Sequence, residues 1–284
     1  MTEYRLIDCG DQKKLEQIGE YRIIRPCPQA MWPKTLDAEW EKADSVFVRG
    51  EGEKGYWKNL KPNQDVKRKQ AGQGVPETWI TTSKDGLQWQ VEPNDYGNIG
   101  IFTEHWIYAP SLVTFFDKNE KILNLFSYTG SNAMGLIAEG FQVTAVDSSS
   151  AAMDSYTMNM GLNKFSRVGQ RLILEDAVKF LQKEERREAL YGGIMIDAPS
   201  YGRGTKGEVF KIEDNLIKLL NHAKKLITNR GKIVLTLHSP RFTPTILRVM
   251  IQKLFPDKTV EAEEIIQICE SKVPLPSGFL VKIY

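Results

Sequence analysis

From about residue 121 onward, short apolar runs alternate with longer amphipathic stretches. The apolar runs predict buried strands at residues 121–126, 142–147, 170–174, 192–197 and 231–237. The stretches that follow them predict helices at about residues 131–139, 149–160, 176–185, 212–227 and 243–254. Because strands and helices alternate, this part of the chain favours an α/β fold with a parallel sheet and right-handed crossovers.

Capping residues mark several of the expected helix ends. Ser149 or Ser150 stands before the second helix and Asp176 before the third, and both residue types are good N-caps. Gly231 follows the apolar face of the fourth helix, and glycine commonly ends helices. We therefore expect that helix to end at Gly231.

The last part of the chain adds two more strands, at residues 264–268 and 278–283, around a proline-rich bend. Together with the five strands above, they complete a seven-stranded sheet. The prediction is a Rossmann-like, doubly wound sheet whose last strand pair is antiparallel.

Residues 1–105 have a different texture, with short alternating strands and turn-rich loops. Strands are predicted at residues 21–26, 45–49, 79–82 and 87–92. The last two flank a turn at residues 84–86, which predicts a hairpin. We therefore predict a β-rich, antiparallel N-terminal appendage that binds substrate (residues 1–105) and a catalytic domain (residues 106–284). A lysine-rich stretch at residues 58–69 is expected to be an exposed loop that either contacts RNA or is simply solvated.

Composition narrows the function classes. The net charge of +2 over 284 residues excludes a protein that binds polyanions over its whole surface, so a nucleic-acid site must be a local patch. Cys9, Cys27 and Cys269 lie far apart, with no metal-ligand spacing to the three histidines. We expect a reduced, cytoplasmic protein with no metal site. No apolar run approaches membrane-spanning length, so no membrane partner is expected.

The first predicted strand of the catalytic domain leads into a turn of small and polar residues, and a second strand ends at Asp147. A strand, turn, helix and acid in this order are typical of nucleoside sites, where the acid binds ribose hydroxyls. The turn lacks two glycines of the dinucleotide fingerprint, which disfavours a pyrophosphate. A ligand with a ribose and a carboxylate but no phosphate fits better, and S-adenosylmethionine (SAM) is such a ligand.

Three acids follow successive strands: Asp147, Asp176 and Asp197. In open parallel sheets, ligands bind beyond the carboxyl ends of the strands. A single acid there is often only a helix cap, but three beside a polar turn indicate a binding site. Asp176 is expected both to cap its helix and to contact the ligand.

The turn at residues 122–130, Asp147, the segment 175–180 and the segment 197–201 resemble successive motifs of class I SAM-dependent methyltransferases. More narrowly, they resemble the bacterial large-subunit ribosomal RNA methyltransferase family. The likeness covers roughly residues 97–284, whereas the first hundred residues match only loosely.

The resemblance implies which residues bind the cofactor SAM. Five would surround its methionine end: Phe126, Ser127, Tyr128, Thr129 and Gly130. Asp147 would hold the ribose hydroxyls, with Ser148 beside the adenine. Asp176 would accept a hydrogen bond from the adenine amino group, with Ala177 alongside.

By the same resemblance, Asp197 and Pro199 would lie where methyl donor and acceptor meet. Tyr201 could stack on an extruded base or be an ordinary exposed aromatic residue. Arg203 and Lys206 lie in the glycine-rich, basic segment after it, which either closes over the site and binds substrate phosphate or is a solvated connection.

Two departures from the family pattern bear on the chemistry. Ala198 stands where the family usually has proline. Methylation of a pyrimidine at carbon 5 needs a cysteine nucleophile, but Ser200 and residues 235–239 offer none. We therefore predict methylation of a base nitrogen, with ribosomal RNA as the expected substrate. His238 is either a proton acceptor or a structural histidine.

Two alternatives stay open at this point. One is a methyltransferase for a protein or a small molecule, which an enclosed apolar cleft would favour. The other is a nucleoside-binding or RNA-binding protein that uses the fold as a scaffold without turnover. A nicotinamide dehydrogenase is disfavoured by the missing glycines.

Overall fold

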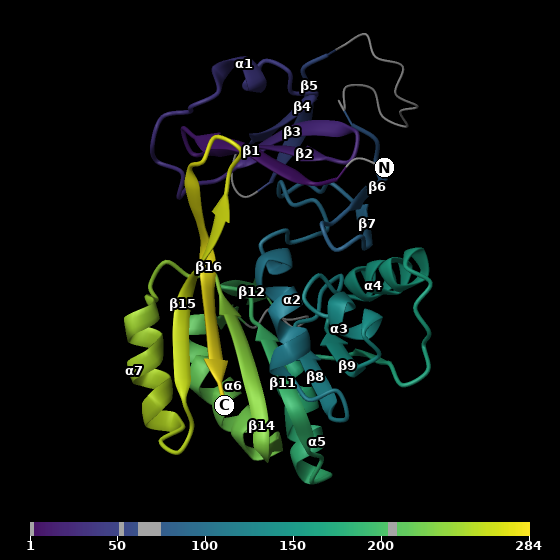
Figure 1. Cartoon of the computed structure of the whole chain (residues 1–284), viewed down its shortest axis with the longest axis vertical. Coiled ribbons are helices and arrows are strands. Elements are labelled where there is room, and N and C mark those ends of the chain that lie inside the picture. The colour runs from purple at the N-terminus through teal and green to yellow at the C-terminus, as the bar shows by residue number, and fades with distance from the viewer. Residues whose placement is uncertain (1–2, 51–53, 62–74, 204–208) are drawn as a thin grey trace. The chain divides into compact units, whose positions relative to one another are not determined.

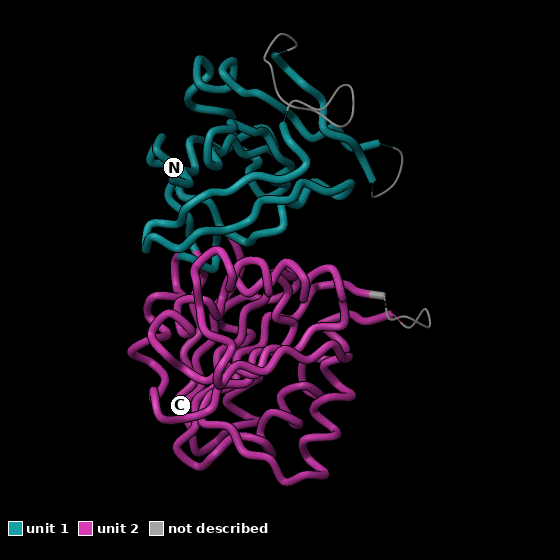
Figure 2. The backbone as a smooth tube through the Cα atoms, turned by 90° about the vertical axis from the view of Figure 1, so that its right-hand side faces the viewer, with its two compact units in different colours: residues 1–106, 266–276 teal, residues 107–265, 277–284 magenta. Residues whose placement is uncertain are grey.

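The computed structural model describes residues 3–50, 54–61, 75–203 and 209–284. It contains two compact units (Figure 2). Unit 1 comprises Met1–Trp106 and Ile266–Pro276, and unit 2 comprises Ile107–Ile265 and Ser277–Tyr284. The segment Ile266–Pro276 is part of unit 1, although all residues after 105 were expected in one domain.

Unit 2 is built on the seven-stranded sheet that was predicted. Its strands are β8 (Lys121–Leu125), β9 (Gln142–Asp147), β10 (Arg171–Leu174), β11 (Tyr191–Asp197), β14 (Ile227–Leu237), β15 (Val260–Ile268) and β16 (Pro274–Ile283). The strand order is β10-β9-β8-β11-β14-β16-β15. The strands from β10 to β14 run parallel, and β16 is antiparallel to β14, which confirms the doubly wound prediction.

Helices cover both faces of this sheet (Figure 1). One layer is formed by α2 (His105–Phe115), α3 (Met134–Ala138) and α4 (Ser150–Leu162). The other is formed by α5 (Ala177–Arg186), α6 (Ile212–Leu226) and α7 (Pro244–Leu254). Of these helices, only α2 was not predicted. Because side chains alternate along a strand, every second residue of the central strands faces each layer, and both sets are buried.

The predicted caps of two helices are confirmed. Ser149 caps α4 and accepts a hydrogen bond from the amide of Ala152, at 3.2 Å. Asp176 caps α5 and accepts one from the amide of Lys179, at 2.9 Å. Each side chain satisfies a backbone donor that has no partner within its own helix.

The prediction for Gly231 was wrong. Helix α6 ends at Leu226, and Gly231 lies within β14, where the pairing with β11 is irregular between Tyr191 and Gly193. A Cβ atom at position 231 would lie 2.6 Å from the Ile227 side chain. The glycine therefore serves close packing at a strand irregularity rather than a helix end.

The proline-rich bend was also misplaced. Pro274 and Pro276 lie at the start of β16, and the chain turns between Cys269 and Val273. Proline is tolerated in the first residues of a strand, where its missing amide costs little. The turn is closed by the amide of Cys269, which donates to the Val273 carbonyl at 3.0 Å.

Unit 1 contains a five-stranded sheet and a separate hairpin. The sheet, in the order β1 to β5, comprises β1 (Arg5–Gly10), β2 (Lys13–Ile18), β3 (Tyr21–Pro26), β4 (Ser45–Arg49) and β5 (Gly55–Asn59). Its pairs are antiparallel except β3 and β4, which run parallel. The hairpin of β6 (Trp79–Thr82) and β7 (Gln88–Val91) was predicted and is confirmed. A short helix, α1 (Asp37–Trp40), follows β3.

A buried ion cluster lies inside the sheet of unit 1. The carboxylate of Glu16 accepts hydrogen bonds from the guanidinium of Arg25 at 2.6 and 2.8 Å. The hydroxyl of Tyr4 and the ammonium of Lys14 each lie 3.1 Å from the same carboxylate. Since Glu16 has no exposed surface, its charge is compensated entirely by protein groups.

The three cysteines are free and buried within unit 1. No helix among the described residues is both long and apolar enough to cross a membrane. Of the predicted lysine-rich loop, residues 62–69 lie outside the described ranges, while Lys58 lies on β5.

Candidate active site

The turn after β8 has an unusual backbone. Phe126 and Tyr128 have φ values of 57° and 45°, a region that residues other than glycine rarely adopt. Three amides hold this conformation: Ser127 donates to the Val146 carbonyl at 3.0 Å, Tyr128 to the Asp147 carboxylate at 2.9 Å, and Gly130 back to the Ser127 carbonyl at 2.9 Å. The second strand therefore shapes the turn that follows the first.

Helix α4 supports the same turn from behind. The Asn159 side chain donates to the Thr129 carbonyl at 2.9 Å. Gly130, with φ 91°, lies so close to α4 that a Cβ atom there would meet the Tyr156 ring at 2.9 Å. Ser127 and Thr129 are buried, whereas Tyr128 is half-buried. Position 130 therefore requires glycine for both its conformation and its packing.

Asp147 ends β9 and is half-buried beside this turn. Its two carboxylate oxygens each accept one backbone amide, from Tyr128 and from Ser149, both at 2.9 Å. A carboxylate offers about four acceptor positions, so this orientation leaves capacity for ligand hydroxyls. Ser148, the next residue, is exposed at the same edge.

Asp176 lies close to Asp147 along the edge of the sheet. The amide of Glu175 donates to the Asp147 carbonyl at 2.9 Å and so joins the ends of β10 and β9. Asp176 is exposed, and Ala177 behind it is buried in the helix layer. The structure thus places the first two acids of the sequence analysis at neighbouring strand ends.

Asp197 ends β11, and its carboxylate is oriented by the neighbouring strand. The Thr236 hydroxyl on β14 donates to Asp197 Oδ1, and Nε2 of His238 lies 3.6 Å from the same oxygen. Ala198 is buried and Pro199 is exposed. Thr236 was not predicted as a site residue, although a polar residue near the end of an apolar strand was a usable signal.

Tyr201 lies on a short ribbon rather than on a loop. Strand β12 (Tyr201–Arg203) pairs antiparallel with β13 (Val209–Lys211), and Tyr201 is 45% exposed. The backbone of Arg203 is part of this ribbon. Lys206, the other predicted substrate contact, lies outside the described residues.

The ribbon packs on the turn after β8 through an aromatic pair that was not predicted. The rings of Phe210 on β13 and Phe126 lie 5.7 Å apart. Beside them is an open hollow of about 290 Å³, lined by Ser200, Tyr201, Lys211, Glu213, Asp214 and Arg241. An aromatic ring, two cations and two acids thus line this hollow.

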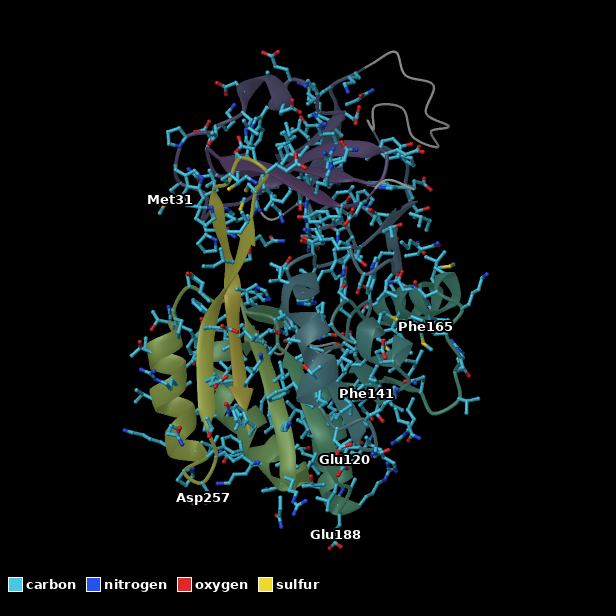
Figure 3. The ribbon with its side chains drawn as sticks, viewed as in Figure 1. Met31, Glu120, Phe141, Phe165, Glu188 and Asp257 are labelled. Carbon is cyan, nitrogen blue, oxygen red and sulfur yellow. The ribbon has the colours of Figure 1, made fainter. Side chains whose placement is uncertain are left out.

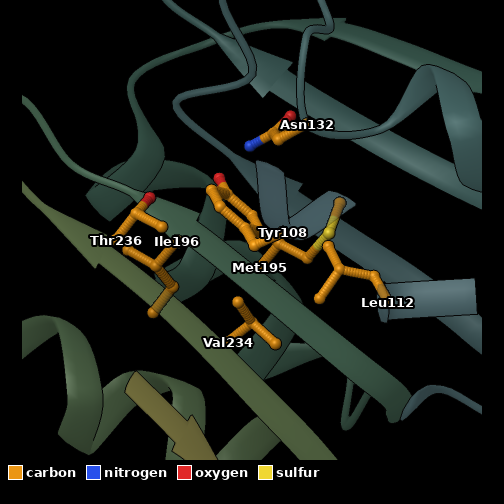
Figure 4. A pocket seen from close by; sticks show the side chains of 7 residues that line it. All are labelled: Tyr108, Leu112, Asn132, Met195, Ile196, Val234 and Thr236. Atoms are coloured by element: carbon orange, nitrogen blue, oxygen red, sulfur yellow. The ribbon is translucent and has the colours of Figure 1, made fainter. Parts of the chain in front are cut away.

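The layer beneath the strand ends is closed and dry. Tyr108 and Leu112 of α2 pack on β11 and β14 around a pocket that is too small to hold a water molecule (Figure 4). Its other lining residues are Asn132, Met195, Ile196, Val234 and Thr236. Asn132 is fixed by a reciprocal amide pair with Asn124, at 3.0 and 3.3 Å. This packing holds β11 and β14 in register below Asp197.

The turn after β8 and the acids Asp147, Asp176 and Asp197 lie at the carboxyl edge of the parallel strands. The chain order reverses between β8 and β11, which makes their carboxyl ends the switch point where ligands bind in open α/β sheets. The acids labelled in Figure 3 as Glu120, Glu188 and Asp257 lie in turns at the opposite, amino edge. The arrangement suits a ligand that reaches from Asp147 to Asp197.

Comparison with solved structures identifies the family. A SAM-dependent methyltransferase from Agrobacterium tumefaciens matches with a TM-score of 0.86 and 30% sequence identity. The match covers 99% of this chain and 90% of that one. The chain belongs to the SAM-dependent methyltransferases. The SAM-dependent methyltransferase resemblance and the fold predicted from sequence are therefore confirmed.

Other comparisons place this methyltransferase more broadly. A structure from Streptococcus mutans matches with a TM-score of 0.77 at 16% identity, over 99% of this chain and 75% of that one, and supports the fold alone. The ribosomal RNA large subunit methyltransferase K/L of Shewanella sp. (strain ANA-3) is 27% identical over 179 residues, which are 61% of this methyltransferase. The chain spans about a quarter of the length of these curated relatives. No family model matches it.

Proposed function

We propose that this methyltransferase transfers a methyl group from SAM to RNA, at a base nitrogen of ribosomal RNA. The observation that supports it most is the likeness to a ribosomal RNA large subunit methyltransferase over 179 residues of this chain. Tyr201 lines an open hollow near the end of β11, which adds to this because an extruded nucleobase needs a stacking surface. Two cations, Lys211 and Arg241, line the same hollow together with two acids, and cations of this kind bind RNA phosphates.

The residues at the carboxyl edge fit SAM. Asp147 is held by two amides and keeps acceptor positions for the two ribose hydroxyls. Asp176 and Ser148 stand exposed on the adenine side. Side chains at positions 126 and 128 leave little room for a pyrophosphate, which suits a cofactor without phosphate. The turn Phe126–Gly130 would enclose the methionine end.

Catalysis would rest on positioning. SAM supplies a methyl group on a sulfonium, which is a very good leaving group. Asp197, oriented by Thr236, would hold the acceptor nitrogen through its hydrogens, and Pro199 and Tyr201 would fix the plane of the base. Holding two reacting atoms at attack distance removes much of the barrier to such a displacement.

The cysteines of unit 1 are not suited to act as the nucleophile that methylation of a pyrimidine at carbon 5 requires. Cys9 and Cys27 are buried within unit 1, and burial raises the pKa of the Cys27 thiol to about 11. Burial likewise raises the pKa of the Cys9 thiol. Because the thiolate is the nucleophilic form, neither thiol is poised to attack a pyrimidine ring.

The test is transfer of radiolabelled methyl from SAM to fractions of a cell lysate, with and without ribonuclease. Label in a ribonuclease-sensitive fraction supports an RNA acceptor. Label that survives ribonuclease would indicate that the methyl acceptor is a protein or a small molecule. SAM binding by calorimetry without label in any fraction would point to a scaffold without turnover.

A further inference from the structure

His238 follows β14 directly and its ring is fixed by a backbone carbonyl. Nδ1 lies 3.1 Å from the carbonyl oxygen of Ser277. A carbonyl only accepts hydrogen bonds, so Nδ1 must carry the hydrogen. In the neutral ring, the lone pair that can take a proton is therefore on Nε2.

Gly278 on β16 provides the space for this ring. A Cβ atom at position 278 would lie 2.8 Å from Nδ1 of His238 and 2.9 Å from the Leu237 carbonyl oxygen. Its φ of 127° also disfavours any side chain. The place of the imidazole thus depends on a glycine in the neighbouring strand.

Nε2 faces the carboxylate that is expected to hold the acceptor. It lies 3.6 Å from Asp197 Oδ1, which is longer than a hydrogen bond. An acceptor nitrogen bound at Asp197 would have Nε2 within reach as a second proton acceptor. A protonated ring at this position would also be stabilised by the Asp197 charge.

We propose that His238 is a catalytic proton acceptor and that the methylated atom is a nitrogen bearing a hydrogen, such as the amino group of a nucleobase. This rests on the proposed function. The nitrogen lone pair forms the N–C bond to the methyl carbon, and the C–S bond breaks, its electron pair leaving with sulfur in S-adenosylhomocysteine. The N–H proton passes to Nε2 of His238, and its electron pair stays on nitrogen.

A proton acceptor at this position distinguishes between two kinds of acceptor nitrogen in RNA. A ring nitrogen without a hydrogen becomes a stable cation on methylation and needs no proton acceptor. An amino nitrogen must lose a proton to give a neutral product. A histidine whose tautomer leaves Nε2 as the acceptor beside Asp197 serves only the second kind.

The first experiment uses the full chain, labelled SAM and unmodified large-subunit ribosomal RNA made by transcription. We expect His238→Gln to lower the single-turnover rate about 100-fold, with SAM affinity unchanged. His222→Gln on α6, whose ring contacts Glu185, is the matched control and should keep the wild-type rate. Added imidazole should restore part of the activity of His238→Gly. A His238→Gln rate within about threefold of wild type would overturn the proposal.

Two further readouts separate this inference from the proposed function. If the wild type labels RNA, mapping the methyl to an amino group supports a proton acceptor, and a hydrogen-free ring nitrogen overturns it. Side-chain nitrogen NMR of the protein alone, assigned by the signal lost in His238→Gln, should show the hydrogen on Nδ1. A hydrogen on Nε2 of the neutral ring would overturn the role of His238. If RNA is not labelled, the proposal of an RNA acceptor is overturned instead. The position of the ring hydrogen in the NMR spectrum would then decide whether His238 can act as a proton acceptor.

Discussion

Buried Glu16 in unit 1 and the acids Asp147 and Asp197 in unit 2 show two ways in which a fold holds a carboxylate. Glu16 is surrounded by the cations of Arg25 and Lys14 and by the Tyr4 hydroxyl. Asp147 accepts two backbone amides, and Asp197 accepts the Thr236 hydroxyl. Neutral donors orient a carboxylate without cancelling its charge.

This difference separates structural acids from candidate functional ones. A carboxylate paired with a guanidinium has its charge and its acceptor positions used inside the protein. Asp147, held by two backbone amides at a strand end, still offers its charge and acceptor positions to a ligand. We therefore expect changes near Glu16 to act on stability, and changes at Asp147 and Asp197 to act on binding and turnover.

The largest effect is expected for Arg25→Met. It leaves the Glu16 carboxylate buried without its main partner, which should lower the free energy of unfolding by about 3–5 kcal/mol. Urea unfolding measures this. The control is Arg5→Gln, which breaks the exposed pair with Glu270 and should cost less than about 1 kcal/mol. Equal losses in the two variants would show that burial does not distinguish these pairs.

The same carboxylate should make stability depend on pH. Burial by itself would raise the pKa of Glu16, but the charges of Arg25 and Lys14 lower it to about 2. Because the folded pKa lies below the unfolded value, this stabilisation is present above about pH 4.5 and is lost as the pH falls towards 2. It amounts to roughly 3 kcal/mol. Comparing the unfolding free energies of wild type and Glu16→Gln across this window should show a steeper acid loss in the wild type; parallel curves would contradict it.

Asp197→Ala should act on turnover. Loss of the group that holds the acceptor is expected to reduce the rate of methyl transfer about 100-fold, because misplacement by about an ångström has that cost. SAM affinity, measured by calorimetry, should change much less. Equal losses in rate and affinity would show that Asp197 is a binding residue only.

Asp147→Ala should act on cofactor binding. Removing hydrogen bonds between a carboxylate and the ribose should weaken SAM by about 1.5–3 kcal/mol in a calorimetric titration. Asp154→Ala is the matched control, since Asp154 is an exposed acid on α4 and should leave the affinity unchanged. An unchanged affinity for Asp147→Ala would mean that the ribose binds elsewhere.

The smallest effect is expected at Asp176, where two roles can be separated. Asp176→Ala removes the cap of α5 and should lower the free energy of unfolding by about 1 kcal/mol. Asp176→Ser keeps a capping oxygen and should retain the stability. If both variants weaken SAM alike, the carboxylate contacts the adenine; if neither does, Asp176 is a cap alone.

The sequence by itself determined the layout of unit 2. The parallel strands were predicted because buried strands read as short apolar runs, and the caps Ser149 and Asp176 because capping depends on neighbours in the chain. The acids at the strand ends followed from the same pattern. Unit 1 was predicted less completely: β1, β2 and β5 carry charged residues within the strand, so that local alternation is weak.

Only the tertiary structure decided what these elements do to one another. The left-handed turn at Phe126 and Tyr128 is imposed by hydrogen bonds to the next strand. The glycine at position 231 is required by close packing within β14. His238 approaches Asp197 because β11 and β14 are neighbours and Gly278 leaves room for the ring. Periodicity and capping are local in the chain and can be read from it, whereas these contacts join residues far apart and exist only once the strands have paired.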